Sequence, residues 1–244
     1  MSGQGDLEGG LEMKTRFAGA ALASLVVLVA VVMVNGAVAG SSPFGAPCPH
    51  PNVIRGTAGD DVLNGTPGND LILGRGGNDT IDGLGGNDCV FGGRGNDTVQ
   101  GGEGNDRVHG GPGNDVTDGG SLGCCQTGND KVYGGRGDDT VFASDFGIQI
   151  LYGGPGADTV QGFNGNDKAY GGRGPDTVNG FTGDDWLSGG QGADHVGNAA
   201  EAGDDVLLGN HGRDTIDGGP GTDRIDGGPG IDACTNGEQV RRCP

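Results

Sequence analysis

The sequence predicts an all-β solenoid built from stacked repeats of nine residues. Three observations support this fold class. Aspartate recurs every nine residues over most of the chain, glycine stands two residues before each of these aspartates, and an aliphatic residue stands two residues after most of them. A period that is kept through many copies is typical of repeat architectures, in which each copy packs only against its neighbours.

The composition limits both the fold and the partners. The chain has 244 residues, of which 59 are glycine, and hydrophobic residues make up 32%. That content is low for one thick core, and collagen is excluded because it needs glycine at every third position. The formal net charge is -19, with 33 acidic against 14 basic side chains. This balance argues against nucleic acids and anionic membranes as partners and favours multivalent cations.

The first element is an expected secretory signal peptide over residues 1–39. Lys14 and Arg16 precede an apolar run (residues 17–34), and an A-x-A sequence ends at Ala39. A charged flank, an apolar run and small residues at the cleavage site are the parts of such a signal. The alternative is a retained membrane anchor, because the run just reaches spanning length. We expect cleavage, a secreted extracellular protein and no membrane contact afterwards.

Short segments flank the repeats. Met13 is a candidate for the true start of the chain, since it stands directly before the basic residues of the signal. Residues 40–55 form a short segment ahead of the repeats, and residues 235–244 form a C-terminal cap. These lengths leave no room for a separate catalytic domain beside the repeats.

Six cysteines follow the expected cleavage site, and an even number in an exported chain predicts disulfides. Cys234 and Cys243 stand at the end of the repeats, where a bridge between them would clamp the terminus. Metal binding by cysteine is the alternative, but the chain has no CxxC pair. The pairing of the other four cysteines stays open: Cys48, Cys89, Cys124 and Cys125.

The repeats occupy residues 56–234 in eighteen copies. Leu, Ile or Val stands two residues after the aspartate in fifteen of them. The glycines permit a tight turn, and the three residues after the aspartate form a short strand with only its middle residue inward. The core is therefore narrow and becomes continuous only when copies stack. The repeat aspartates are Asp61, Asp70, Asp79, Asp88, Asp97, Asp106, Asp115, Asp130, Asp139, Asp158, Asp167, Asp176, Asp185, Asp194, Asp205, Asp214, Asp223 and Asp232.

The phrase GGRGNDTVQ, at residues 92–100, resembles the G-G-x-G-x-D-x-U-x nonapeptide of the RTX proteins, the hemolysin-type calcium-binding repeats. The resemblance covers about residues 56–234. It implies a parallel β-roll in which two nonapeptides complete one turn and Ca²⁺ ions lie between successive turns on each side. It also implies that the eighteen aspartates supply carboxylate ligands and that backbone carbonyls of the glycine-rich turns supply the rest.

Electrostatics gives a separate reason to expect cations. Parallel strands stack about 4.8 Å apart, so carboxylates on the same side would lie about 5 Å from one another. Each such pair repels by roughly 3 kcal/mol at an effective dielectric near 20, which one aliphatic side chain per copy does not offset along a whole column. Ca²⁺ accepts about six to eight oxygens in adaptable geometry, whereas Mg²⁺ demands a stricter octahedron. Calcium binding and folding are expected to be one equilibrium.

Three insertions interrupt the period, after Asp115, Asp139 and Asp194. The second insertion contains GIQIL, in which Gln149 takes the place of the aspartate. We interpret this stretch as a nineteenth copy that stacks but ligates weakly. Counting ion sites only within unbroken runs predicts roughly ten Ca²⁺ ions.

No catalytic constellation is evident, and we expect that the protein is not an enzyme. The sequence has no G-x-S-x-G and no H-E-x-x-H motif, and its four histidines fall at unrelated repeat positions. The predicted function is that of a secreted calcium-binding β-roll. The alternative is a calcium-rigidified structural or adhesive surface protein that presents residues 118–126 and 142–152 to an extracellular partner. Outward side chains such as Arg94 and Gln100 are mixed and polar and indicate no patch.

Overall fold

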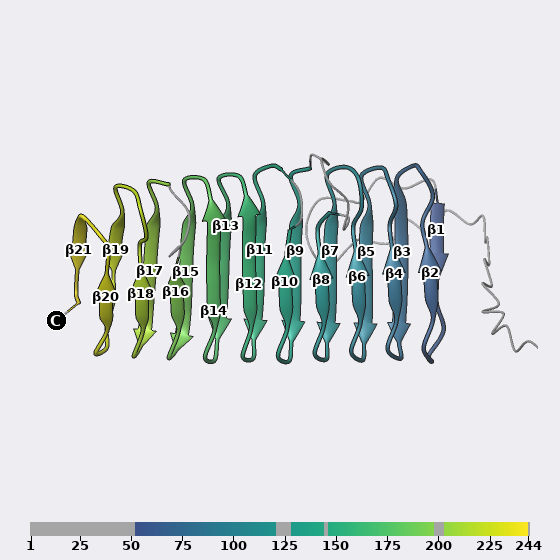
Figure 1. Cartoon of the computed structure of the whole chain (residues 1–244). Coiled ribbons are helices and arrows are strands. Elements are labelled where there is room, and N and C mark those ends of the chain that lie inside the picture. Colours follow the sequence, from purple (N-terminus) through teal and green to yellow (C-terminus); the bar gives the residue numbers. More distant parts are fainter. Residues whose placement is uncertain (1–51, 121–127, 144–145, 198–202, 244) are drawn as a thin grey trace, which may run out of the picture.

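The computed structural model describes residues 52–120, 128–143, 146–197 and 203–243. These residues form a long roll of β-strands joined by short turns (Figure 1). The expected signal peptide, the candidate start at Met13 and three cysteines (Cys48, Cys124 and Cys125) lie outside the described residues. Within the described part, no helix has the length and apolar character needed to cross a membrane.

Two parallel sheets face each other, and the chain alternates between them. The odd sheet contains β1 (Asn52–Arg55), β3 (Asp70–Gly76), β5 (Cys89–Arg94), β7 (Arg107–Pro112), β9 (Lys131–Arg136), β11 (Ile150–Pro155), β13 (Lys168–Arg173), β15 (Trp186–Gly192), β17 (Val206–Gly212), β19 (Arg224–Asp226) and β21 (Gln239–Arg241). The even sheet contains β2 (Val62–Asn64), β4 (Thr80–Asp82), β6 (Thr98–Gln100), β8 (Val116–Asp118), β10 (Thr140–Phe142), β12 (Thr159–Asn164), β14 (Thr177–Thr182), β16 (His195–Gly197), β18 (Thr215–Asp217) and β20 (Ala233–Thr235).

The register joins equivalent positions of alternate repeats. Val160 of β12 pairs with Val178 of β14, eighteen residues later, so two nonapeptides complete one turn. Across the first insertion Val108 pairs with Val132, which keeps the same repeat position although the separation is longer. The register of the roll is therefore the same on both sides of the insertion. The predicted parallel β-roll is confirmed.

The core is a double row of side chains between the two sheets. It consists mainly of the residues that stand two positions after the aspartates, as the sequence predicts, together with Leu151 after Gln149 and with Ala143. Even the non-aliphatic Thr117 is fully buried there. Because each turn contributes only two such side chains, the hydrophobic surface is closed only by the turns above and below it. The buried aliphatic members are Leu63, Ile72, Ile81, Val90, Val99, Val108, Val132, Val141, Leu151, Val160, Ala169, Val178, Leu187, Val196, Leu207, Ile216 and Ile225.

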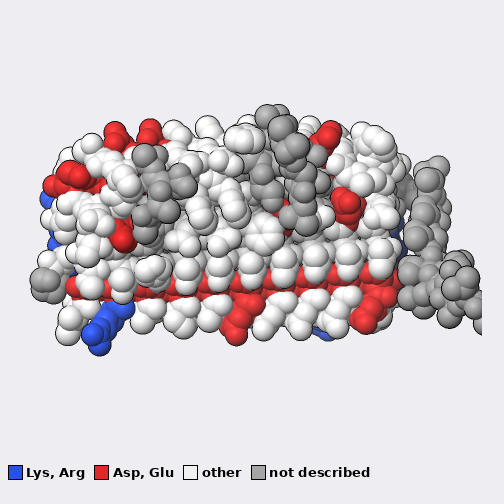
Figure 2. Space-filling model, in the orientation of Figure 1, with Lys and Arg blue, Asp and Glu red and all other residues white. Residues whose placement is uncertain are grey.

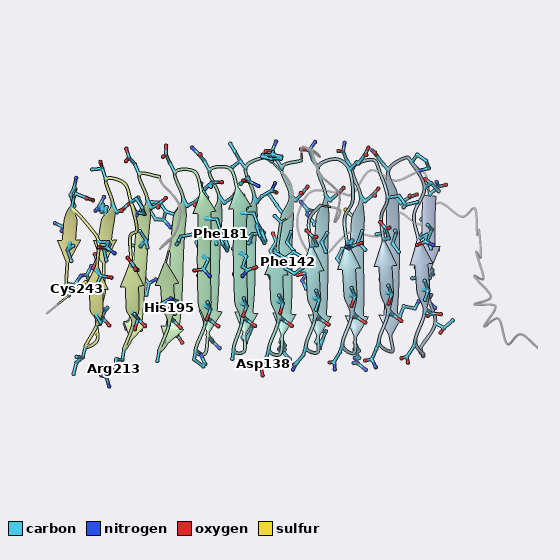
Figure 3. The ribbon with its side chains drawn as sticks, viewed as in Figure 1. Asp138, Phe142, Phe181, His195, Arg213 and Cys243 are labelled. Atoms are coloured by element: carbon cyan, nitrogen blue, oxygen red, sulfur yellow. A yellow bond between two sulfur atoms is a disulfide. The ribbon has the colours of Figure 1, made fainter. Side chains whose placement is uncertain are left out.

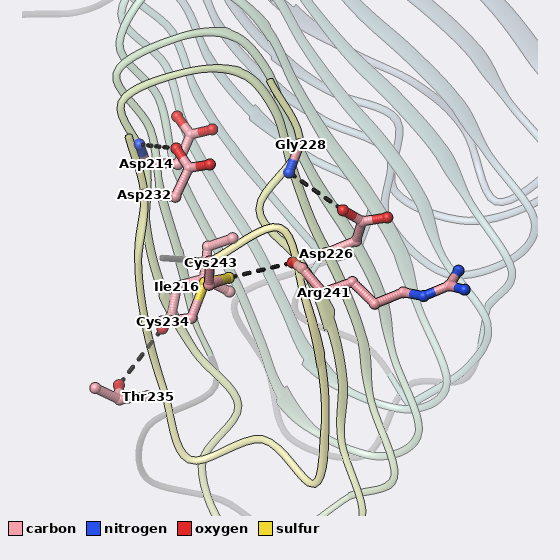
Figure 4. The surroundings of a disulfide bond; sticks show 9 residues. All are labelled: Asp214, Ile216, Asp226, Gly228, Asp232, Cys234, Thr235, Arg241 and Cys243. Carbon is pink, nitrogen blue, oxygen red and sulfur yellow. Dashed lines mark hydrogen bonds between the residues drawn. A yellow bond between two sulfur atoms is a disulfide. The ribbon is translucent and has the colours of Figure 1, made fainter. Parts of the chain in front are cut away.

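The C-terminal end of the roll is held by the segment after the last repeat. Cys234 and Cys243 lie beside each other with Cα atoms 5.9 Å apart, in the arrangement predicted for a clamp (Figure 4). In addition, Arg242 donates a hydrogen bond of 2.6 Å to Asp226 Oδ2, and the two form an ion pair. Strand β21 pairs with β19 and is the last strand of the odd sheet, so it covers the edge of β19.

Candidate metal centres

The eighteen repeat aspartates form two ladders, one along each edge of the roll where the chain passes between the sheets. All except Asp61 are buried, and a row of acidic side chains runs the length of the roll in Figure 2. The first ladder holds Asp61, Asp79, Asp97, Asp115, Asp139, Asp158, Asp176, Asp194, Asp214 and Asp232. The second holds Asp70, Asp88, Asp106, Asp130, Asp167, Asp185, Asp205 and Asp223.

Each rung is tied to the next by a hydrogen bond. The backbone N–H of one aspartate donates to Oδ1 of the aspartate one turn later, as from Asp79 to Asp97 at 2.8 Å. The insertions do not interrupt this pattern: the N–H of Asp115 reaches Oδ1 of Asp139 at 2.8 Å. The ladders therefore contain fifteen stacked aspartate pairs, because pairs that span the insertions count as well. Counting within unbroken runs misses those pairs.

The second carboxylate oxygen lacks such a donor along most of the two ladders. A buried carboxylate oxygen without a hydrogen bond is costly unless something compensates it. A repeated set of them therefore indicates a missing cationic partner. Among the described residues, Oδ2 is buried and accepts no hydrogen bond in Asp79, Asp88, Asp97, Asp115, Asp139, Asp158, Asp167, Asp176, Asp185, Asp194, Asp214, Asp223 and Asp232.

A backbone oxygen lies close to most of these carboxylate oxygens. A Cβ atom added at Gly171 would lie 2.6 Å from Asp176 Oδ2 and 2.6 Å from the carbonyl oxygen of Gly189, one turn later. Gly153 has the same two neighbours, Asp158 Oδ2 and the carbonyl oxygen of Gly171, also at 2.6 Å. A side chain at this position would fill a niche lined by oxygen atoms. The glycine of this repeat position keeps the niche open.

Burial raises the pKa of the ladder carboxyls. It raises the pKa of Asp167 to about 8 and that of Asp88 to about 7. The pKa of Asp139 also rises to about 7, first because of burial and then because of the charges of Asp115 and Asp158, while the N–H of Asp115 opposes the rise. The same cause raises the pKa of Asp176 and Asp185 to about 7 and that of Asp79, Asp115, Asp158 and Asp194 to about 6.

This order of causes corrects the expectation from electrostatics alone, in which repulsion between neighbouring carboxylates makes the metal-free stack unstable. Repulsion contributes, but the loss of hydration is the larger cause for these groups. The backbone N–H inserted between successive rungs reduces the repulsion, whereas no donor among the described residues replaces the water lost from Oδ2 of the aspartates named above.

The donor set fits a hard divalent cation. Carboxylate and carbonyl oxygens are the ligands that Ca²⁺ takes, whereas zinc prefers histidine and cysteine. No group of three or more acidic, histidine or cysteine side chains converges in the described part of the chain. An ion in either ladder would therefore take most of its ligands from backbone carbonyls, and one or two aspartates would each contribute a carboxylate to it.

Both ladders begin with a threonine whose role was not predicted from the sequence. The N–H and hydroxyl of Thr66 donate to Asp70 Oδ2, at 2.6 and 3.0 Å. The hydroxyl of Thr57 donates to Asp61 Oδ2 at 3.0 Å. In these first rungs of the described roll, protein donors take the place that a cation would have at Oδ2. The signal was present in the sequence, since these two copies alone read G-T-x-G ahead of the ladder aspartate.

Gln149 occupies one rung of the second ladder, as predicted. Its Oε1 accepts the N–H of Asp130 at 2.6 Å, and its own N–H donates to Asp167 Oδ1 at 2.8 Å. In place of an unpartnered oxygen, Nε2 donates to the carbonyl oxygen of Gly128 at 3.0 Å. The amide group thus satisfies this buried rung without a cation.

The second ladder ends with Glu238, which was also not predicted from the sequence. Its Oε2 accepts the N–H of Asp223 at 2.6 Å, in the way that an aspartate does in the turns before it. Glu238 stands two residues before Val240, so it keeps the acid-to-aliphatic spacing of the repeats. Glu238 lies 15 residues after Asp223, so a search for a fixed period does not find it.

Comparison with known proteins gives one family. The family model described as the RTX calcium-binding nonapeptide repeat matches six stretches, which together exceed half of the chain: residues 55–89, 91–121, 126–146, 144–178, 161–196 and 200–233. No curated protein matches the chain.

Proposed function

This chain belongs to the RTX calcium-binding nonapeptide repeat family, and from that premise we propose that it is a secreted, non-enzymatic protein in which Ca²⁺ ions bridge successive rungs of both aspartate ladders. The observation that carries the proposal is the repeated, buried Oδ2 atom beside a carbonyl oxygen of the next turn. A divalent cation at each niche compensates the buried charge. Because the niche exists only between stacked turns, binding is coupled to folding.

The charge of the chain supports the same proposal. Residues 40–244 contain 30 acidic and 12 basic side chains, and 18 of the acids are the ladder aspartates, which leaves 12 acids and 12 bases elsewhere. The whole net charge of the exported part therefore lies in the two ladders. Ions bound there neutralise the protein without any other counter-charge. The niches are expected to fill at the sub-millimolar to millimolar calcium of extracellular modules.

The C-terminal cap has a supporting role in this proposal. A disulfide between Cys234 and Cys243 closes the last turn, where no further repeat protects the end of the core. Such a bond limits fraying of the terminal strand by restricting the unfolded chain. Its formation is consistent with an exported protein, because the cytosol keeps thiols reduced.

Calcium stoichiometry tests the proposed role of the ladders. We expect Asp139→Asn to lower the number of bound Ca²⁺ ions by at least one per chain, because the asparagine keeps the Oδ1 acceptor but loses the charge. Asp138→Asn is the matched control. Its side chain is exposed and projects from the turn (Figure 3), and asparagine fills this position in eight other copies.

Equilibrium dialysis followed by elemental analysis gives the ion count for both variants and for the parent chain. A parent chain that binds no calcium, or equal counts for Asp139→Asn and the parent, would contradict the ladder assignment. The same dialysis against Mg²⁺ is expected to leave the chain nearly metal-free, since Mg²⁺ keeps its water and requires stricter geometry.

Restoring the missing carboxylate at Gln149 is expected to add a site. Gln149→Asp removes the amide that hydrogen-bonds to Gly128 and returns an unpartnered oxygen to this rung. We expect at least one additional Ca²⁺ ion per chain and a less stable metal-free state. Gln161→Asp adds the same charge on an outward-facing position of β12 and serves as the control. An unchanged ion count in Gln149→Asp would show that this rung cannot take a cation.

A further inference from the structure

The two sheets differ sharply in charge. No strand of the even sheet carries a lysine or arginine, and β4, β8 and β18 each carry an outward or terminal aspartate. The strands of the odd sheet hold ten of the basic side chains: Arg55, Arg75, Arg94, Arg107, Lys131, Arg136, Lys168, Arg173, Arg224 and Arg241. The sequence indicated no patch on the outward positions, and this expectation is wrong.

The central odd strands carry cations and no acids. Strands β5 to β17 of the odd sheet contain no aspartate or glutamate. Arg94, Arg136 and Arg173 occupy the same repeat position on every second strand of this sheet, so they recur roughly 10 Å apart along the roll. All three are exposed, and none forms an ion pair among the described residues. In so acidic a chain, an unneutralised row of arginines is unexpected.

A row of stacked aromatic rings runs parallel to the arginines. Tyr152 stacks on Tyr133 with ring centroids 4.9 Å apart and on Tyr170 at 5.0 Å. His109 and Phe91 extend the row, with centroid distances of 5.5 and 6.0 Å. The rings are nearly parallel, so their faces cover one another and the row presents ring edges and tyrosine hydroxyls outward. The row stiffens this face and adds polar atoms beside the cations.

An open groove continues the arginine row toward the C-terminal end. Its volume is about 550 Å³, and its lining includes Pro155, Arg173, Ser188, Gln191, Asn210 and His211. Arg173, Gln191 and His211 are neighbours across three adjacent strands. The lining therefore offers hydrogen-bond donors and acceptors around one exposed cation, set in a surface that is otherwise mostly apolar because of its glycine, proline and side-chain carbon atoms.

We propose that the outer face of the odd sheet binds a linear anionic polysaccharide that lies along the roll. The row of Arg94, Arg136 and Arg173 meets its charged groups at regular intervals, because charge-assisted contacts from arginine suit carboxylates and sulfates. The groove beside Arg173 and the tyrosine hydroxyls receive its hydroxyl groups. This activity gives the protein a recognition surface. It differs from the alternative expected from the sequence, in which residues 118–126 and 142–152 are presented to a partner.

Other polyanions fit this face less well. Single-stranded nucleic acid is bound by stacking bases on free aromatic faces, and the ring faces of this row are occupied by one another. An anionic membrane is a plane, so it would also meet the exposed carboxylates at the turns on both edges, such as Asp138 and Asp184. A narrow chain can follow the arginine row and avoid them.

This inference rests on the proposed function in one respect. Without ions, the two ladders give the roll a large negative charge, and a polyanion would be repelled. With ions in the ladders, the remaining acids and bases balance and the odd sheet becomes the positive face. Polysaccharide binding is therefore expected to require the calcium-loaded roll.

The test uses the full chain, purified in its calcium-loaded form, on sensors that carry chondroitin sulfate. Neutral dextran, single-stranded oligothymidine and phosphatidylserine vesicles are measured alongside at the same calcium concentration. We expect binding to chondroitin sulfate, no binding to dextran, and weakening with added salt. The variant with Arg94, Arg136 and Arg173 all changed to Gln is expected to bind at least about tenfold more weakly. Changing Arg213, Arg224 and Arg241 to Gln makes the matched control. Arg224 and Arg241 lie on the terminal strands β19 and β21 and Arg213 lies in a turn, all outside the acid-free strands β5 to β17 that carry the arginine row, so affinity is expected to change less than about twofold.

Equal losses in both triple variants would overturn the inference, because net charge alone would then explain binding. Tighter binding to oligothymidine or to the vesicles would overturn the choice of a polysaccharide. Circular dichroism of each sample separates the two proposals. A folded, calcium-loaded chain that does not bind chondroitin sulfate would contradict this inference but not the proposed function. A chain that keeps its fold in chelator and still binds through the arginine row would contradict the proposed calcium role and the expected calcium requirement of binding, and would leave only the arginine row as the binding site.

Discussion

The metal-free chain is expected to be unfolded above about pH 8 and to regain β-structure as the pH falls. In this state protons take the place of the calcium ions. Burial raises the pKa of ladder carboxyls to values from about 6 for Asp79 to about 8 for Asp167. Protonation removes the buried charge, so it lowers the cost of stacking the turns.

The direction follows from proton linkage. The ordinary pKa of 3.8 applies in the unfolded chain, and the folded, metal-free roll has raised values. Between these values the folded state binds more protons, so its stability rises as the pH falls. The gain is complete below 3.8 and is lost as the pH rises through about 6 to about 8. In the presence of calcium the trend reverses, because protons compete with the ions for the same carboxylates.

Far-ultraviolet circular dichroism across this pH range, on a chain freed of metal on a chelating resin, measures the transition. The calcium-loaded chain at high pH provides the folded reference. Gln149→Asp adds one more buried carboxyl to the ladder, so its midpoint is expected at a lower pH than that of the parent. A metal-free chain that is fully folded above pH 8, or one that gains no β-signal on acidification, would contradict the assignment of buried, uncompensated charge to the ladders.

Replacing Gly113 by alanine is expected to destabilise the calcium-loaded roll by about 3 kcal/mol or more. Gly113 has a φ of 149°, which side chains rarely adopt, and a Cβ atom there would overlap the carbonyl group of Gly95 in the preceding turn. The carbonyl group of Gly95 and the Cα atom of residue 113 both belong to backbone that is hydrogen-bonded between turns. Neither can move aside without breaking those hydrogen bonds. The loss is therefore expected to spread to both neighbouring turns.

Gly59→Ala is the matched control, since it makes the same chemical change at the same repeat position. Gly59 lies in the first turn of the described residues, and a Cβ atom there would have no neighbour within 4 Å. We expect its free energy of unfolding to change by less than about 0.5 kcal/mol. Urea unfolding in saturating calcium measures both variants. Equal stability of the two would mean that the turns are not packed as closely as the structure places them.

Much of the candidate site could be predicted from local spacing. The positions of Asp97 and Val99 within one nine-residue phrase decide that the first lies in a turn and the second in the core, because a short strand alternates its side chains. Gln149 was identifiable for the same reason, since Leu151 keeps the spacing of the phrase. Thr66 and Glu238 were missed, because their roles depend on being the first or last rung rather than on the phrase itself.

The sequence alone determined which repeat position each residue occupies, and with it the fold class, the inward row and the two sets of carboxylates. These properties follow from the local period, which acts over a few residues. Only the tertiary structure decided which residues meet one turn apart. It joined the ladders across the insertions, revealed burial as the main cause of the raised pKa values, and gathered Arg94, Arg136 and Arg173 on one face. Successive copies alternate between the sheets, so neighbours in space are two copies apart in the chain. Insertions lengthen that separation in sequence without changing which repeat positions pair.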